Sequence, residues 1–439
     1  MAEAASEATC SRREQRAWYM YDFANSAFSS TVVTLFLGPY LTALAKAAAD
    51  EAGRVYPLGI PVDARSYWSY LISLSVLSQV ALLPLAGAVA DASPNKKRIL
   101  GWLAYTGAAA TMAMFALTDG MYLWGGFLFL VANLAFGASI VVYNSFLNDI
   151  APPEQRDAVS SVGWGIGYLG GGILLALNLL LYQNARRLGL DESMAVRISL
   201  GSAGAWWAFF TLIPMAGLRP RGAAHPPAEP VWRSGFLQLW RTVRSLSRYR
   251  QALLFLAAYL LYNDAIQAVI TLSGQFGADH LKMPMGDLTM AILMVQFVAF
   301  GGALLFQRVA EKLGAYRTVM ISLFLWTALM CGVFFIRTGR DFFVAAALVA
   351  MIMGGTQALS RSLFSLMIPK GKEAEYFSLY EISDKGTSWL APLIFGLALQ
   401  FTGSYEWAIA SLVVFFVAGI AVLARVDVRR GMQEAQQGS

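Results

Sequence analysis

The chain of 439 residues is far more apolar than a soluble protein: 57% of its residues are hydrophobic and only 14% are charged, whereas soluble domains carry roughly 25% charged residues. This composition excludes a string of water-soluble domains and predicts an all-α polytopic membrane protein. The net charge of +6 is small, and two Cys and two His are too few for a clustered metal site. No GxxxxGK[ST] phosphate loop occurs, so we expect no enzymatic activity, no metal and no cofactor.

Apolar runs long enough to cross a membrane recur from end to end and predict twelve transmembrane helices. The first six are expected at 17–44, 67–90, 99–118, 121–148, 161–182 and 197–217. The second six are expected at 252–277, 287–309, 317–336, 342–368, 377–401 and 405–424.

These spans predict two six-helix bundles, 17–217 and 251–424, joined by a basic connector, 218–250. Short tails, 1–16 and 425–439, complete the chain. Within the connector, apolar residues follow helical spacing between arginines, which predicts an amphipathic helix on an anionic membrane surface. A simple topological anchor and a regulated lipid-binding or protein-binding element are both compatible with it. The apolar positions are Trp232, Phe236, Leu239, Trp240, Val243 and Leu246.

The distribution of Lys and Arg predicts the orientation of the chain. Of the 33 Lys and Arg residues, 22 fall on the side that contains both termini and nine on the other side. The positive-inside rule therefore places both termini in the cytoplasm. We expect a bacterial inner (plasma) membrane as the location.

An internal repeat relates the two halves. The end of the second span has a Gly and an Asp four residues apart, followed by three basic residues, and the end of the eighth has an acid at the corresponding place. Glycine permits close helix approach, and the acid can form a charged latch that breaks as two halves rock. The alternative is a plain helix end with a basic anchor. The predicted cytoplasmic latch comprises Gly87, Asp91, Lys96, Lys97, Arg98, Asp149, Arg156 and Glu311.

Polar residues gather in the first, fourth, seventh, tenth and eleventh spans, whereas the third, sixth, ninth and twelfth have apolar interiors. Polar groups in a membrane face protein or water, so spans one, four, seven and ten are expected to line a central path. Asp264 falls near mid-depth, where burial disfavours a charged carboxylate; it is a candidate for proton coupling or for a structural hydrogen bond. The central transport site is predicted at Asn133, Asn263, Asp264, Gln267, Gln296 and Gln357.

A second polar cluster is expected nearer the cytoplasmic surface. Counting along the helices places three acids and two bases at one depth. They could form an ion-paired gate, hold a zwitterion, or pair only for structural reasons. This inner gate or substrate cluster comprises Asp22, Asn25, Arg361, Glu381, Asp384 and Lys385.

The two-half plan, with the Gly87–Asp91 spacing and the basic run that follows it, resembles the major facilitator superfamily. Several segments look like one branch of it, the autophagy-related vacuolar amino-acid effluxers and their bacterial relatives. The resemblance implies secondary transport by alternating access, with amino acids as the substrate class. The matching segments are 21–28 (YDFANSAF), 149–156 (DIAPPEQR), 160–172, 354–362 and 368–372.

The sequence thus predicts a secondary transporter that moves an amino acid or related zwitterion, with efflux coupled to protons as one option. A sugar, drug or lipid-like solute is the alternative within the same class, and a transport-dead receptor or scaffold is the alternative outside it. The expected partners are a small solute, protons and membrane lipids. We expect no nucleic acid, and we expect a monomer.

Overall fold

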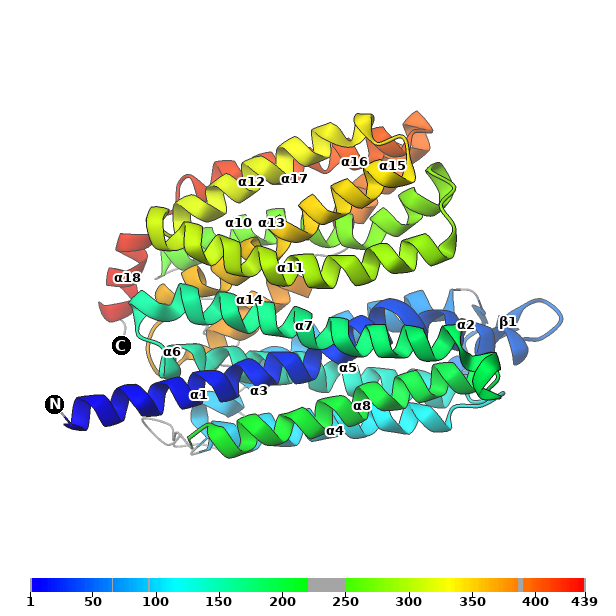
Figure 1. The fold of residues 1–439 in the computed structure, drawn as a ribbon, viewed down its shortest axis with the longest axis horizontal. Helices are drawn as coiled ribbons and strands as arrows, with labels where there is room; N and C mark the ends of the chain where they lie inside the picture. Colours follow the sequence, from blue (N-terminus) through cyan, green and yellow to red (C-terminus); the bar gives the residue numbers. More distant parts are fainter. Residues whose placement is uncertain (1, 65, 94, 220–248, 386–389, 438–439) are drawn as a thin grey trace. The chain divides into compact units, whose positions relative to one another are not determined.

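The computed structural model describes residues 2–64, 66–93, 95–219, 249–385 and 390–437, most of which are helical (Figure 1). The predicted amphipathic helix of the connector lies outside these ranges. The chain forms two compact units. The first comprises Met1–Leu83, Pro94–Tyr143 and Ile166–Gly222; the second comprises Pro84–Ser93, Asn144–Gly165 and Ala223–Ser439.

Three helices pass from one unit to the other. They are α3 (Tyr67–Ala92), α5 (Tyr122–Ser145) and α7 (Arg156–Gln183). In α3 the change falls between Leu83 and Pro84, and proline there removes a backbone donor inside the helix. The end of α3, the end of α5 and the start of α7 therefore belong to the second unit.

The first unit begins with three consecutive helical segments that form one long rod: α1 (Ala2–Ala27), η1 (Phe28–Phe36) and α2 (Leu37–Ala47). Its middle section is a π-helix, in which the Thr34 hydroxyl donates to the carbonyl of Ser29, five residues earlier (2.9 Å). A Cβ on Gly170 of α7 would lie 2.3 Å from the Phe23 carbonyl oxygen, so glycine permits α7 to approach this rod. The other helices that lie wholly in this unit are α4 (Lys96–Ala113), η3 (Met114–Ala116), η5 (Ala185–Leu188) and α8 (Glu192–Gly217).

A small hairpin follows α2. Strands β1 (Arg54–Val55) and β2 (Val62–Asp63) pair antiparallel, and η2 (Pro57–Gly59) lies between them. Asp50 closes the hairpin: its carboxylate accepts from the amides of Ala52 (3.0 Å) and Arg54 (2.8 Å) and from the Tyr56 hydroxyl (2.6 Å).

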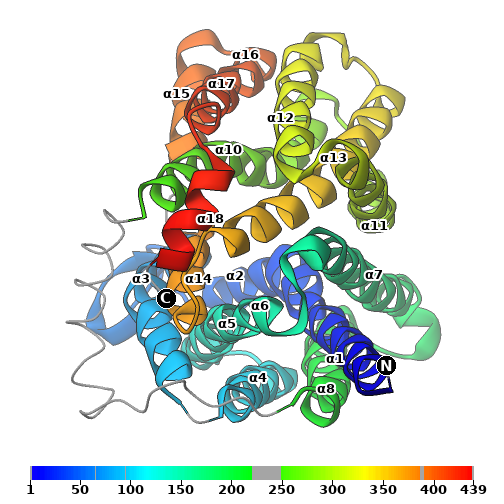
Figure 2. The ribbon, with the colours of Figure 1, turned by 90° about the vertical axis from the view of Figure 1, so that its left-hand side faces the viewer.

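The second unit is built mainly from helices of the C-terminal half. Helix α11 packs on α13, α10 packs on α17 and α14, and the terminal α18 contacts α10 and α13 (Figure 2). Its helices are α6 (Leu147–Ile150), η4 (Pro153–Gln155), α10 (Arg250–Gln275), η6 (Phe276–His280), α11 (Met285–Leu313), α12 (Ala315–Cys331), η7 (Gly332–Phe335), α13 (Gly339–Leu366), α14 (Glu373–Lys385), α15 (Leu390–Thr402), α16 (Tyr405–Ser411), α17 (Val413–Leu423) and α18 (Val428–Gln437).

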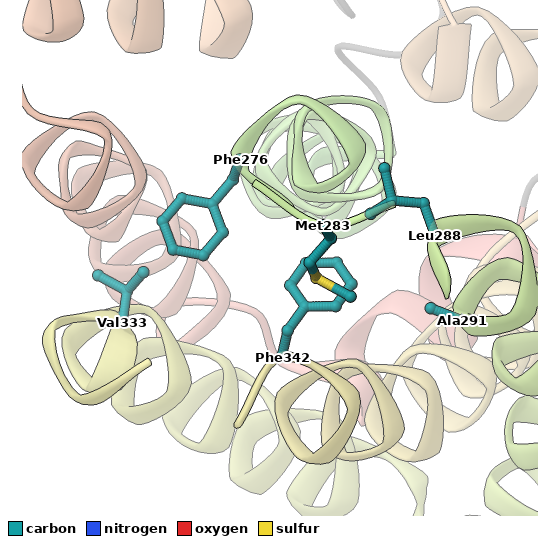
Figure 3. Close-up of a cluster of buried hydrophobic side chains, with 6 residues drawn as sticks. All are labelled: Phe276, Met283, Leu288, Ala291, Val333 and Phe342. Carbon is teal, nitrogen blue, oxygen red and sulfur yellow. The ribbon is translucent and has the colours of Figure 1, made fainter. Parts of the chain in front are cut away.

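An apolar cluster holds one end of this unit together. Figure 3 shows six side chains converging from η6, the segment before α11, the start of α11, η7 and the start of α13. Burying such side chains stabilises a helix junction without hydrogen bonds. The cluster consists of Phe276, Met283, Leu288, Ala291, Val333 and Phe342.

The predicted spans correspond to these helices. Eleven helices within the described residues are long and apolar enough to cross a membrane; the remaining predicted span, the eleventh at 377–401, includes residues 386–389, which lie outside the described ranges. The share of buried residues is 61% in the first, fourth and seventh spans and 56% in the tenth, against 28–50% in the others. The four spans expected at the centre are therefore the most buried ones.

Candidate functional site

The end of α3 packs against the start of α14. The Asp91 carboxylate accepts hydrogen bonds from the backbone amides of Ala374 (3.1 Å) and Glu375 (2.8 Å). A carboxylate in this position satisfies free amides and interacts favourably with the helix dipole. A Cβ on Gly87, one turn earlier, would lie 2.5 Å from the Ala374 carbonyl oxygen. Gly87 and Asp91 of the predicted latch therefore join two helix ends.

The start of α7 is tied to the end of α13. Arg156 is 8% exposed; its Nη1 donates to the Ser365 carbonyl (2.7 Å) and its Nε to the Ala151 carbonyl (3.2 Å). The Ser362 hydroxyl donates to the carboxylate of Asp157. These bonds join a segment of the first half of the chain to a helix of the second half.

Arg361 also joins α13 to α7. It is 2% exposed, and it donates from Nε to the Ser160 hydroxyl (2.9 Å) and from Nη2 to the Ser160 carbonyl (2.8 Å). Its guanidinium carbon lies 5.4 Å from the centre of the Trp164 ring, within the range of a cation–π contact. Both partners come from α7. Several interactions thus stabilise one buried cation.

Asn144, at the end of α5, connects Arg361 to an acid. Its Oδ1 accepts from Nη1 of Arg361 (3.3 Å), and its Nδ2 donates to Oε1 of Glu381 on α14 (2.9 Å). Glu381 is 5% exposed. A buried charge needs hydrogen bonds to offset its lost hydration, and the Asn144 amide supplies one to each of these two charges.

One turn further along α14, Asp384 faces α10. Its Oδ1 accepts from the Tyr259 hydroxyl (2.9 Å) and from Nδ2 of Asn263 (2.7 Å). Asp384 of the predicted inner cluster thus contacts Asn263 of the predicted central site. We refer to Asn144, Tyr259, Asn263, Arg361, Glu381 and Asp384 as the α14 polar network.

Asp264, beside Asn263, faces the start of α15. Its Oδ2 accepts from the backbone amide of Ala391 (2.9 Å), and the residue is 2% exposed. Neither its Oδ1 nor Oδ1 of Asn263 has a hydrogen-bond partner among the described residues. Two acceptor atoms at the centre of α10 are therefore available to a proton, a water molecule or a solute.

In the first unit, Asp22 of the predicted inner cluster accepts from the Tyr143 hydroxyl (2.7 Å). The Tyr143 ring stacks on Trp18, with centroids 4.3 Å apart, and Trp18 Nε1 donates to the Tyr143 carbonyl (2.9 Å). Asn25, one turn after Asp22, is 2% exposed, and its Nδ2 has no partner within the described ranges. These residues join α1 to α5.

The other predicted central residues are distributed over both units. Asn133, in the first unit, donates to the Ser75 hydroxyl (2.9 Å) and so joins α5 to α3. Gln267 of α10 and Gln296 of α11 are half-buried in the second unit, and Gln357 of α13 is buried there. The side chain of Lys385, at the end of α14, is not among those that the structure describes.

Lys97, Asp149 and Glu311 of the predicted latch contact different parts of the chain. Lys97 Nζ donates to the Leu218 carbonyl (2.8 Å) at the end of α8, Arg98 is exposed and Lys96 is buried. Asp149 is half-buried within α6 and interacts electrostatically with Arg156 of the same predicted latch. Glu311 is exposed and accepts from Gln307 of its own helix (3.1 Å), unlike its predicted counterpart Asp91.

Sequence reasoning missed four partners in these sites: Asn144, Ser160, Tyr143 and Tyr259. Asn144 and Ser160 lie at helix ends, where polar residues are common. Tyrosines in a span are usually interface or packing residues. Tyr259 could have been found from the sequence. It precedes Asn263 by four positions and therefore lies on the same helix face as a predicted site residue.

Comparisons with known proteins agree on the family and the fold. The family model described as "Vacuole effluxer Atg22 like" matches residues 10–436. An uncharacterised MFS-type transporter of Bacillus subtilis, YxiO, is 30% identical over 427 residues, which is 97% of each chain. Autophagy-related protein 22 of Kluyveromyces lactis is 26% identical over 97% of this chain and 96% of its own length.

Solved structures similar to this chain share its fold at low sequence identity. The human organic anion transporter MFSD10 (TETRAN) has a TM-score of 0.69 at 13% identity and covers 94% of this chain and 99% of its own. The major facilitator superfamily transporter FucP has a TM-score of 0.67 at 12% identity, covering 95% and 98%. The twelve-helix transporter fold expected from the sequence is confirmed. The chain belongs to the vacuole effluxer Atg22-like family of the major facilitator superfamily.

Proposed function

We propose that this protein is a secondary transporter that exports an amino acid or a related zwitterion by alternating access. The observation that carries the proposal is the α14 polar network. It holds a buried cation, Arg361, and two acids, Glu381 and Asp384, on neighbouring helices of one unit. The family description names an effluxer, which supports the direction.

The network matches the chemistry of a zwitterion. A guanidinium binds a carboxylate through two parallel hydrogen bonds, and the carboxylates of Glu381 and Asp384 can accept from an ammonium group. The donors of Arg361 are occupied by Ser160 and Asn144. Transfer of the guanidinium from these partners to a solute carboxylate would release the segments of α5 and α7 from α13. Binding would thus weaken the contact that closes the inner gate.

Asp264 is the proposed proton-coupling residue. One of its oxygens is held by the Ala391 amide, and the other has no partner within the described part of the chain. A proton can therefore be added at Oδ1 without breaking a hydrogen bond. Because α10 also carries Asn263, the charge on Asp264 can influence the α14 polar network one residue away.

Location and assembly complete the proposal. The chain is an integral membrane protein, and its Bacillus relative supports a plasma membrane. The distribution of Lys and Arg supports cytoplasmic termini. We propose a monomer, because one chain contains both halves of the expected transport path.

Purified protein in proteoliposomes tests the activity. Vesicles loaded with a mixture of amino acids should release specific members of the mixture, and Arg361→Ala should abolish this release. Arg186→Ala is the matched control, because Arg186 is exposed and pairs only with Glu192 in the described structure. Release of a sugar, drug or lipid-like solute instead would refute the substrate class. No flux across the whole panel, with or without a pH gradient, would refute transport.

Asp264→Asn tests coupling separately. Asparagine keeps an oxygen that can accept from the Ala391 amide, so the protein should fold normally while it loses the titrating group. Uptake driven by a pH gradient should disappear, and exchange without a gradient should remain. Asp287→Asn, at an exposed acid of α11, should retain both. Driven uptake unchanged in Asp264→Asn would reject this residue as the coupling group.

A further inference from the structure

A groove runs between α1 and α8 on the surface of the first unit. Its volume is about 510 Å³. Figure 2 views the ribbon from the end at which α1 begins, and it shows α1 and α8 side by side. Arg13 and Arg16 lie at this end of the groove. Its apolar lining is formed by Ala17, Met20, Leu212, Ile213, Ala216 and Gly217.

Small residues shape the floor of the groove. A Cβ on Gly217 would lie 2.4 Å from the Cβ of Ala17, so the two helices are in close contact there. About one turn before Gly217 on α8, two larger apolar side chains remain exposed: Leu212 is 55% exposed and Ile213 is 41% exposed. Because α8 is one of the apolar spans, its uncovered side chains face hydrocarbon in a bilayer. The natural occupant of this groove is therefore an acyl chain.

The arginines give the groove a charged end. Arg13, Arg16, Ala17 and Met20 follow the i, i+3, i+4, i+7 spacing that places them on one face of α1. Both guanidinium groups are exposed, and neither has a hydrogen bond or ion pair within the described ranges.

The acid between them does not neutralise this charge. Glu14 is 4% exposed, accepts from the backbone amide of Arg219 (2.9 Å) and does not line the groove. Two positive charges without a partner among the described residues thus lie where an apolar groove meets the membrane surface.

We propose that this groove binds one anionic phospholipid. An acyl chain lies along the floor between α1 and α8, and the phosphate lies between Arg13 and Arg16. Guanidinium groups match the geometry of phosphate oxygens, and basic pockets between transmembrane helices are a known setting for anionic headgroups. The site is separate from the α14 polar network and is independent of the transported solute.

Native mass spectrometry of the full chain in detergent tests the proposal. Phosphatidylglycerol should bind more tightly than phosphatidylcholine with the same acyl chains. Arg13→Gln/Arg16→Gln should reduce phosphatidylglycerol affinity about thirtyfold, since each of the two basic residues contributes about 1 kcal/mol near an anionic surface and about 1.4 kcal/mol is tenfold. The matched control is Arg186→Gln/Arg187→Gln, at two exposed arginines that do not line the groove, and it should bind like the parent.

Two further arms separate the headgroup from the acyl chain. Ala216→Trp fills the groove without changing its charge and should weaken binding of both lipids. Glycerol phosphate, which has no acyl chain, should not compete with phosphatidylglycerol. Equal affinity for the two lipids, or parental affinity in Arg13→Gln/Arg16→Gln, would overturn the proposal. Competition by glycerol phosphate, or parental binding in Ala216→Trp, would overturn the assignment to a lipid in this groove.

Discussion

At the scale of single residues, Asn144 explains how a buried arginine and a buried glutamate coexist within the α14 polar network. An amide offers one acceptor and two donors, so it can hydrogen-bond an arginine on one side and a carboxylate on the other. It accepts from Arg361 and donates to Glu381. A neutral side chain between two charges can also exchange partners at lower cost than a direct ion pair, because no charge moves.

Asn144→Ala should therefore impair both stability and transport. Loss of the amide leaves a donor of Arg361 and an acceptor of Glu381 without that partner, and such buried unsatisfied groups cost about 1–3 kcal/mol of unfolding free energy. Thermal unfolding in detergent and flux in proteoliposomes would measure the two effects. Asn184→Ala removes an amide that bonds only to nearby residues, donating to the Leu180 carbonyl and accepting from the exposed Arg187, and it should change neither. Parental flux in Asn144→Ala would show that the bridge is dispensable.

The sequence identified the charged members of the network and Asn263, but not the other neutral residues. Arg361, Glu381 and Asp384 attract attention because charge inside a span is costly. Asn144, Ser160 and Tyr259 carry no such cost at a helix end or as an aromatic residue, so their role depends on which helix lies opposite. That information is tertiary, and one sequence does not contain it.

At the scale of elements, two helix N-termini receive a carboxylate from another helix. Asp91 of α3 bonds the first turn of α14, and Asp264 of α10 bonds the start of α15. Each carboxylate satisfies free amides and opposes the positive end of a helix dipole. Helices α14 and α15 are thus each held by a carboxylate from a different helix.

Gly87→Ala should loosen the first of these joints. The added methyl would collide with the Ala374 backbone, which cannot move as a side chain can. Displacing α14 should lengthen the Asp91 hydrogen bonds and cost about 1–3 kcal/mol of unfolding free energy, seen as a lower midpoint of thermal unfolding. Gly301→Ala in α11 is the matched control, because nothing lies within 4 Å of a Cβ there. An equal or higher midpoint in Gly87→Ala would contradict the close contact.

The hairpin after α2 should be sensitive to acid. The Tyr56 hydroxyl, followed by the Arg54 amide, holds the pKa of the Asp50 carboxyl below its ordinary value. A lowered pKa means that the charged carboxylate stabilises the hairpin above about pH 4, the value for an unfolded aspartate. This stabilisation is lost as the pH falls through the lower, folded pKa.

Hydrogen exchange of residues 50–63, corrected for intrinsic rates, would measure this loss. Asp50→Asn should show the same loss of protection at neutral pH. Glu51→Gln changes an exposed acid next to it and should not. Protection that is independent of pH from 7 to 3 would exclude Asp50 as the closing residue.

The positions of the helices were largely predictable, but their interruptions were not. Hydropathy located the first span at 17–44, yet it gave no sign of the π-helix within it, which depends on local hydrogen bonds such as Thr34 to Ser29. Hydropathy also predicted one span at 377–401, and this range includes most of α14 and α15. The mean hydropathy of a segment predicts that it lies in lipid. The backbone geometry within the segment depends on local hydrogen bonds and on the helices packed against it.

At the scale of the whole molecule, the two compact units do not coincide with the two halves of the chain. The end of α3, the end of α5 and the start of α7 come from the first half of the chain, yet they belong to the second unit. Hydrogen bonds at Asp91, Asn144, Ser160 and Asp157 attach them to α13 and α14. Alternating access requires that contacts between halves break and form again in each cycle, and these are the contacts that the structure offers for that role.

A covalent cross-link across this junction should stop transport. In a chain carrying Cys10→Ser and Cys331→Ser, the pair Asp157→Cys/Ser362→Cys places thiols where two side chains are hydrogen-bonded between α7 and α13. A short bifunctional thiol reagent should join them and abolish solute flux in proteoliposomes. A reagent cleavable by dithiothreitol should allow recovery, because the block is conformational and not chemical damage.

The control pair lies within one half of the chain. Ser202 donates to Asn178 (3.1 Å) between α8 and α7, so Asn178→Cys/Ser202→Cys should cross-link equally well and leave flux intact. Loss of flux in both pairs would show only that added cross-links are harmful. Full flux in cross-linked Asp157→Cys/Ser362→Cys would mean that α7 and α13 stay together throughout the cycle, and the inner gate would then have to lie elsewhere. Block of the first pair alone would require these two helices to separate for the solute to pass.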